Sequence, residues 1–174
     1  MTQFTSASAN KYLKKLEDEK SFVLKREAQS STYRLAVGEE AEPPAYDYAA
    51  TRDKVDELDA KVLKLRHAIH SFNAATVLPQ AGMTIDEALI AMAQLNGKLY
   101  RLATLKDTPP KERAGASYGF GRTMGYDSRT VEYVYANYDH APVEADYDAV
   151  SDQITAIQLE LDLVNQTKTF EIDL

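Results

Sequence analysis

The chain has no cysteine among its 174 residues, and this absence removes several classes of chemistry. Without thiols, the protein forms no disulfide, no thiolate metal site and no cysteine nucleophile. Long hydrophobic runs are also missing, since no stretch approaches the roughly 20 apolar residues of a membrane-spanning helix. Residues 1–10 are polar and contain no apolar segment of signal-peptide length. These absences favour the cytoplasm as the expected location and disfavour a membrane as a partner.

Basic residues are fewer than acidic residues: the chain has 20 Lys and Arg against 27 Asp and Glu, for a net charge of -7. This balance disfavours nucleic acid as a partner, because phosphates attract basic surfaces. Lysines and arginines do crowd residues 11–26, where a solvated helical face is the better interpretation. A chain of this length is expected to form a single helical domain over residues 1–174.

Hydrophobic residues recur at alternating spacings of three and four, the pattern of helices that pack lengthwise. It predicts four helices, over residues 8–29, 47–75, 84–105 and 142–166. The first helix is expected to turn inward Leu13, Leu16, Val23 and Leu24. The stripe of the second consists of Val55, Leu58, Val62, Leu65, Ile69 and Phe72. The stripe of the fourth consists of Tyr147, Val150, Ile154, Ile157, Leu161 and Val164.

Two short segments alternate with period two instead and are predicted as strands, Tyr33–Val37 and residues 130–138. Short connections make neighbouring helices antiparallel, which brings both strands to the same end of the bundle. The predicted fold class is therefore mainly α: an antiparallel long-helix bundle of four coiled-coil-like helices with a small two-stranded β-ribbon at one end. At the start of the third helix, Thr84 and Glu87 have the spacing of a capping box.

Residues 107–130 are rich in glycine and tyrosine and are predicted to be a flexible loop insertion. Candidate partner contacts on this loop and on the adjoining strand are Tyr118, Phe120, Arg122, Tyr133 and Tyr135. Tyrosine suits interfaces because it combines a large buried area with a polar tip. Phosphate cradling or stacking on bases are alternatives, but the loop does not join a strand to a helix as a P-loop does.

Polar residues at the expected helix ends form a second candidate site. The predicted topology brings together Asn73, Thr76, Asp86 and Asn165. Such a cluster could bind a small ligand, although helix ends more often use polar side chains to satisfy free backbone groups.

Residues typical of catalysis or metal binding are present only in incomplete sets. His67 and His70 lie three apart and lack a third ligand, so they are interpreted as surface histidines. Asp139 and His140 have no serine nucleophile with an elbow motif and are expected at a turn or helix start. Asp146 and Asp148 lack the rest of a calcium loop. No catalytic residue, metal site or cofactor is predicted.

The segments Asn73-Ala74-Ala75-Thr76 and Thr84-Ile85-Asp86-Glu87-Ala88-Leu89 resemble the central signature of the septicolysin-like family of small bacterial helical proteins. The resemblance extends over residues 47–105 and 131–174 and is weaker over the first helix. It implies a helical, coiled-coil-like protein of uncharacterised activity, with Asn73, Thr76, Asp86 and Asn165 at signature positions. Residues 111–128 depart from the family pattern.

The leading hypothesis for function is a non-enzymatic, self-associating helical protein that acts as an interaction or structural module. It is expected to form homo-oligomers and to contact a protein partner through the ribbon and the loop. One alternative is a nucleic-acid-binding helical arm that uses the basic first helix and the aromatic loop. The other is a toxin-like membrane-active oligomer, as the family name suggests.

Overall fold

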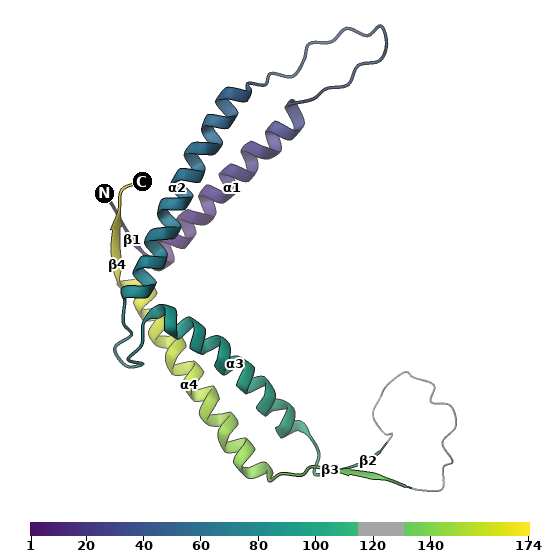
Figure 1. The fold of residues 1–174 in the computed structure, drawn as a ribbon, viewed down its shortest axis with the longest axis vertical. Coiled ribbons are helices and arrows are strands. Elements are labelled where there is room, and N and C mark those ends of the chain that lie inside the picture. Colours follow the sequence, from purple (N-terminus) through teal and green to yellow (C-terminus); the bar gives the residue numbers. More distant parts are fainter. Residues whose placement is uncertain (115–130) are drawn as a thin grey trace. The chain divides into compact units, whose positions relative to one another are not determined.

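The computed structural model describes residues 1–114 and 131–174, which group into two compact units (Figure 1). The first unit comprises Met1–Ala88 and Leu159–Leu174, and the second comprises Leu89–Gln158. The described helices are α1 (Ser6–Ser30), α2 (Tyr48–Ala75), α3 (Ile85–Asp107) and α4 (His140–Thr167). The predicted class is confirmed: the protein is mainly α, with bundled helices and a small β component. The single helical domain over residues 1–174 stays a prediction.

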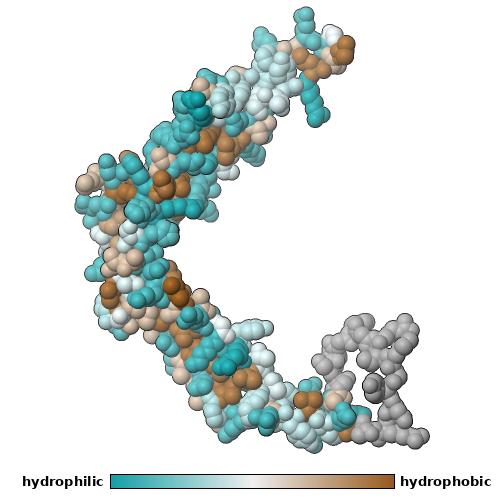
Figure 2. Space-filling model, viewed as in Figure 1, coloured by the Kyte–Doolittle hydropathy of each residue, from teal (hydrophilic) through white to brown (hydrophobic). Residues whose placement is uncertain are grey.

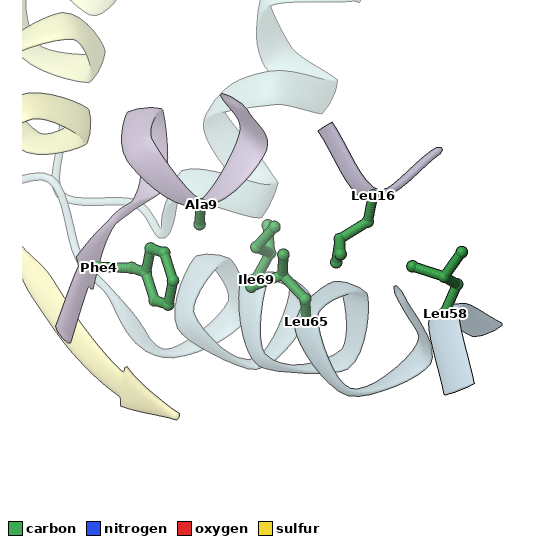
Figure 3. Packing of buried hydrophobic residues seen from close by; sticks show 6 residues of the cluster. All are labelled: Phe4, Ala9, Leu16, Leu58, Leu65 and Ile69. Atoms are coloured by element: carbon green, nitrogen blue, oxygen red, sulfur yellow. The ribbon is translucent and has the colours of Figure 1, made fainter. Parts of the chain in front are cut away.

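In the first unit, α1 and α2 lie side by side and bury a shared hydrophobic core (Figures 1 and 3). Leu58 and Leu65 of α2 are the most deeply buried of its stripe, at 1% and 0% exposure. Leu16 of α1 packs into the same cluster. Leu24, expected inward, is instead 41% exposed, because the stripe of α1 becomes irregular toward its C-terminal end.

The first unit also contains a ribbon that the sequence patterns did not predict. It pairs an N-terminal strand with a C-terminal strand. Strands β1 (Thr2–Thr5) and β4 (Thr169–Ile172) pair antiparallel, with Phe4 directly opposite Phe170. Phe4 is buried against the α1–α2 core, and the Phe170 ring lies 5.0 Å from that of Phe72. Strands of four residues are too short for alternation to stand out from chance, which explains why they were missed.

The second ribbon pairs β2 (Lys111–Arg113) with β3 (Tyr133–Tyr135). The strand predicted over residues 130–138 is thus confirmed in its centre, but its predicted partner is wrong. Tyr33–Val37 is exposed and forms no strand, and no segment among residues 1–114 and 131–174 pairs with its backbone. Gly38, with φ of +89°, instead turns the chain there. The true partner, β2, lies closer to β3 in the sequence than residues 33–37 do, so its pairing with β3 closes a shorter loop.

In the second unit, α3 and α4 lie side by side (Figure 1). The Lys106 ammonium of α3 sits 4.7 Å from the ring centre of Tyr147 on α4. The predicted stripe of α4 is confirmed by Val150 and Ile157 in the second unit and by Leu161 and Val164 in the first, which are all at most 5% exposed. Among the described residues, no helix has both the length and the apolar character required to traverse a bilayer.

Candidate interaction surface

The β2–β3 ribbon presents two tyrosines and two cations on one face. Side chains alternate between faces along a strand, so Tyr133 and Tyr135 share a side. In an antiparallel pair, directly opposed residues also share a side. The register sets Lys111 opposite Tyr135 and Arg113 opposite Tyr133. We call the side formed by these four residues the tyrosine face.

Side-chain contacts confirm this arrangement. The two tyrosine rings lie 6.5 Å apart, and the Lys111 Nζ is 4.2 Å from the ring centre of Tyr133 and 5.3 Å from that of Tyr135. The ammonium therefore interacts with both π faces and helps to fix the ring positions. Tyr133 is 47% exposed and Tyr135 60% exposed, so much of both rings is open to solvent. Both predicted contact residues of the strand are thus accessible.

The opposite face of the ribbon has the opposite charge. Glu112 lies opposite Val134, and the Ala114 N–H donates to the Glu132 carbonyl at 2.9 Å, which continues the register by one pair. By alternation, Glu112 and Glu132 both project away from the tyrosine face. The ribbon thereby segregates its cations from its carboxylates. A surface of this kind favours an anionic partner on the tyrosine face.

The base of the ribbon is fixed to the ends of α3 and α4. The Tyr138 hydroxyl donates to the Leu105 carbonyl at 2.7 Å, and His140 Nε2 lies 2.7 Å from the Thr108 carbonyl. Asp139 accepts from the Ala141 N–H at 3.1 Å, at the first turn of α4. Asp139 and His140 therefore have the turn and helix-start role that was predicted. These contacts hold the strands in place at their base.

The remaining predicted contact residues, Tyr118, Phe120 and Arg122, lie outside the described residues. Their contribution to a partner surface stays a prediction. Elsewhere, Figure 2 shows hydrophobic side chains in separate patches along the helices on the face in view. The tyrosine face combines two aromatic rings with two cations on one side of a ribbon.

The predicted polar cluster belongs entirely to the first unit, at the α2–α3 connection and the end of α4. Thr76 acts through its backbone, which donates to Phe72 and accepts from Ile85, both at 2.9 Å. Asp86 is exposed in the first turn of α3. Asn73 Oδ1 is buried and has no partner within the described residues. No hydrogen bond joins the four side chains there, and the backbone contacts agree with a role at helix ends.

Sequence reasoning missed Glu160, which organises the same connection. This carboxylate of α4 is only 8% exposed, and it accepts from the Gln80 N–H at 2.7 Å and the Ala81 N–H at 3.0 Å. It thus satisfies two backbone donors in the turn that precedes α3, where Gly82 has a φ of +67°. The available signal was an acid placed between Ile157 and Leu161 in an otherwise apolar stripe.

The predicted capping box at the start of α3 is confirmed. The Thr84 N–H donates to the Glu87 carboxylate at 2.7 Å, and the Glu87 N–H donates to the Thr84 hydroxyl at 3.2 Å. The hydrogen bonds from Thr84 hold the pKa of Glu87 below its ordinary value, with the backbone bond contributing most. This box and Glu160 stabilise the segment in which the family-like signature lies.

Residues considered for metal binding are dispersed. His67 and His70 are exposed on α2, as predicted, and Asp146 and Asp148 are exposed on α4. Across residues 1–114 and 131–174, no group of three or more His, Asp or Glu side chains is placed to hold a metal ion.

A pocket of about 240 Å³ opens in the first unit beside the segment that connects α1 and α2. Its lining includes Phe22, Arg26, Glu27, Tyr46 and Lys54. The Tyr46 hydroxyl donates to Glu27 at 2.6 Å, a bond that raises the pKa of Tyr46 to about 12. This bond fastens the connecting segment to α1.

Comparisons with known proteins define the fold but no activity. No protein-family model matches the chain, and no curated protein matches it. A crystal structure of a functionally unknown conserved protein from Corynebacterium diphtheriae is similar, with a TM-score of 0.65 and 15% sequence identity. The match covers 98% of this chain and 100% of that protein. The two proteins share a fold, and the resemblance to the septicolysin-like family stays a prediction.

Proposed function

We propose that this chain is a non-enzymatic, self-associating helical protein that acts as an interaction module through the tyrosine face. The observation that supports this proposal is the pair of exposed rings, Tyr133 and Tyr135, held against Lys111 at the tip of the second unit. The absence of cysteine from the chain supports a cytoplasmic location.

Energetic considerations favour contact with a second surface. A two-stranded ribbon is only marginally stable in water unless its side chains pack on something. Each aromatic side chain can bury on the order of 150–250 Å², so covering both tyrosines contributes substantially to association. A ribbon whose base is tied to Leu105 and Thr108 presents its rings in a fixed position, which lowers the entropic cost of binding.

The test compares substitutions of exposed tyrosines inside and outside the ribbon. We expect the weight-average mass of the wild type, measured by light scattering after size-exclusion chromatography, to rise with concentration. The double variant Tyr133→Ala/Tyr135→Ala should remain monomeric. The control is Tyr100→Ala, which removes a 79% exposed tyrosine of α3 and should associate like the wild type. A wild type that is monomeric at several hundred micromolar would refute the proposal.

A further inference from the structure

The segment that connects α1 and α2 carries a short anionic and proline-containing stretch. Residues 39–45 read Glu-Glu-Ala-Glu-Pro-Pro-Ala, and all of them are exposed. No helix or strand forms there. We call this stretch the acidic strap. Its three carboxylates are opposite in charge to the lysine and arginine of the tyrosine face. Its two prolines are of the kind that contacts aromatic rings.

The acidic strap is held at both ends and unengaged between them. At its start, the Glu39 N–H donates to the Ala36 carbonyl at 3.1 Å, and the Glu39 carboxylate accepts from the Ala36 N–H at 3.0 Å. Immediately after it, Tyr46 is bonded to Glu27. Within the described residues, Glu40 and Glu42 make no hydrogen bond or ion pair. Their carboxylates are therefore available to a partner.

The chemistry of the acidic strap matches that of the tyrosine face. Pro43 and Pro44 fix φ near −65° and bias the preceding residue toward an extended backbone, so little conformational entropy is lost on docking. Proline-containing extended segments bind aromatic-lined surfaces. The side chains of Lys111 and Arg113 share the side of the tyrosines and supply cations for the strap's carboxylates.

We infer that the tyrosine face of one copy of this chain binds the acidic strap of a second copy. This inference rests on the proposed function and names the surface that the ribbon contacts. Because the ribbon of one copy meets a different segment of the other, two copies can exchange both contacts around a two-fold axis or share a single contact. A dimer with both contacts is closed, whereas a dimer with a single contact retains one unoccupied ribbon and one unoccupied strap and associates further.

Charge exchange tests this pairing in the full-length protein. The ribbon variant Lys111→Glu/Arg113→Glu and the strap variant Glu40→Lys/Glu42→Lys should each associate about tenfold more weakly than the wild type in sedimentation velocity. Combining all four substitutions reverses the charge on both surfaces and should restore association to near the wild-type level. Mixing the two single-surface variants should likewise yield heterocomplexes, because opposite charges then face each other.

A matched control separates a local effect from a change in net charge. Asp146 and Asp148 are exposed acids with the same spacing as Glu40 and Glu42. The variant Asp146→Lys/Asp148→Lys should therefore associate like the wild type. Circular dichroism of every variant establishes that the helices are intact, so that loss of association is not loss of folding.

The outcomes distinguish the inference from the function on which it rests. If tyrosine substitution abolishes association but the four-substitution variant does not regain it, the strap is not the ligand and the proposed function stands. If the wild type does not associate at all, both fail. The inference is overturned if each charge variant associates as strongly as the wild type. It is also overturned if the strap and the ribbon pair to an extent that does not depend on protein concentration. Tight binding of single-stranded nucleic acid to the wild type, lost in the ribbon variant, would assign the tyrosine face to that partner instead.

Discussion

The two antiparallel ribbons in the described part of the chain are similar in size but use their aromatic residues in opposite ways. In the β1–β4 ribbon, Phe4 is 9% exposed and packs on the core of α1 and α2, with its ring 5.6 Å from that of Tyr12. In the β2–β3 ribbon, Tyr133 and Tyr135 are about half exposed and contact a lysine rather than a core.

The difference shows how a short ribbon can be stabilised in two ways. The β1–β4 strands gain most of their stability from apolar burial, so they form part of the unit's own core. The β2–β3 strands depend on side-chain hydrogen bonds to backbone carbonyls at their base and on a cation over the rings, which leaves the aromatic surface open. Phenylalanine suits the first setting and tyrosine the second, because its hydroxyl remains solvated until a partner covers the ring.

The largest effect is predicted for a substitution in the β1–β4 ribbon, whose aromatic side chain is buried. Replacing Phe4 with alanine should lower the free energy of unfolding by about 3–5 kcal/mol, because it removes a buried ring and leaves a cavity. The matched change in the other ribbon, Tyr133→Ala, should lower it by at most about 1 kcal/mol, because the exposed ring loses mainly its cation–π contact. Urea denaturation monitored by circular dichroism measures both values. Equal losses in the two variants would show that the ribbons do not differ as described.

A smaller effect is predicted for Glu160, the buried carboxylate of α4 that contacts the α2–α3 connection in the first unit. Glu160→Gln should cost about 1–3 kcal/mol, since the amide NH2 replaces one of the two oxygens that accept separately from the Gln80 and Ala81 N–H groups. Glu144→Gln changes an exposed acid of the same helix and serves as the control. The same denaturation experiment applies. If the two variants were equally stable, Glu160 would not organise the α2–α3 connection.

On the exposed ribbon, removal of the cation is expected to have a modest effect. Lys111→Gln should destabilise the protein by at most about 0.5–1 kcal/mol, the usual range for an exposed cation–π contact. Lys98→Gln removes an exposed lysine of α3 and should have no effect. Thermal unfolding of the two variants, run side by side, is sensitive enough to separate them. A loss of several kcal/mol for Lys111→Gln would mean that this ribbon belongs to a core.

The smallest effect concerns the pH dependence of the α3 cap. The pKa of Glu87 is lowered below its ordinary value of 4.5 by the hydrogen bonds from Thr84. A depressed pKa stabilises the fold above the unfolded value, and this contribution is lost as pH falls through the lower folded value. The wild type should therefore have a higher Tm than Glu87→Ala. This difference in Tm should be largest at pH 6 and should decrease toward pH 3. A difference that stays constant would contradict this.

Much of the helical architecture was predictable from the sequence. The stripes through Leu58 and Leu65 on α2, and through Val150 and Ile157 on α4, lie inward as expected, because helix periodicity over many turns is a strong signal. The Thr84–Glu87 cap was predictable for a similar reason, since its chemistry is local. Helix bounds agree to within a few residues.

The ribbons were less predictable because strand pairing depends on distant segments. Residues 33–37 alternate like a strand, yet they pair with no other described segment and stay exposed. Thr2–Thr5 has almost no pattern, yet it pairs with Thr169–Ile172 from the other end of the sequence. Tyr133 and Tyr135 were predicted as partner contacts, and both are exposed. The cations opposite them were not, since the register that aligns Lys111 with Tyr135 follows from pairing alone.

The most direct test of the tyrosine face follows tyrosine side chains in solution. Of the eleven tyrosines, those at 133 and 135 should shift progressively in NMR spectra of ring-labelled protein as concentration rises, with substitution to phenylalanine assigning each signal. The exposed Tyr100 and the half-buried Tyr12 should stay in place. Signals that are all insensitive to concentration, or shifts at other tyrosines while these two remain fixed, would contradict the account.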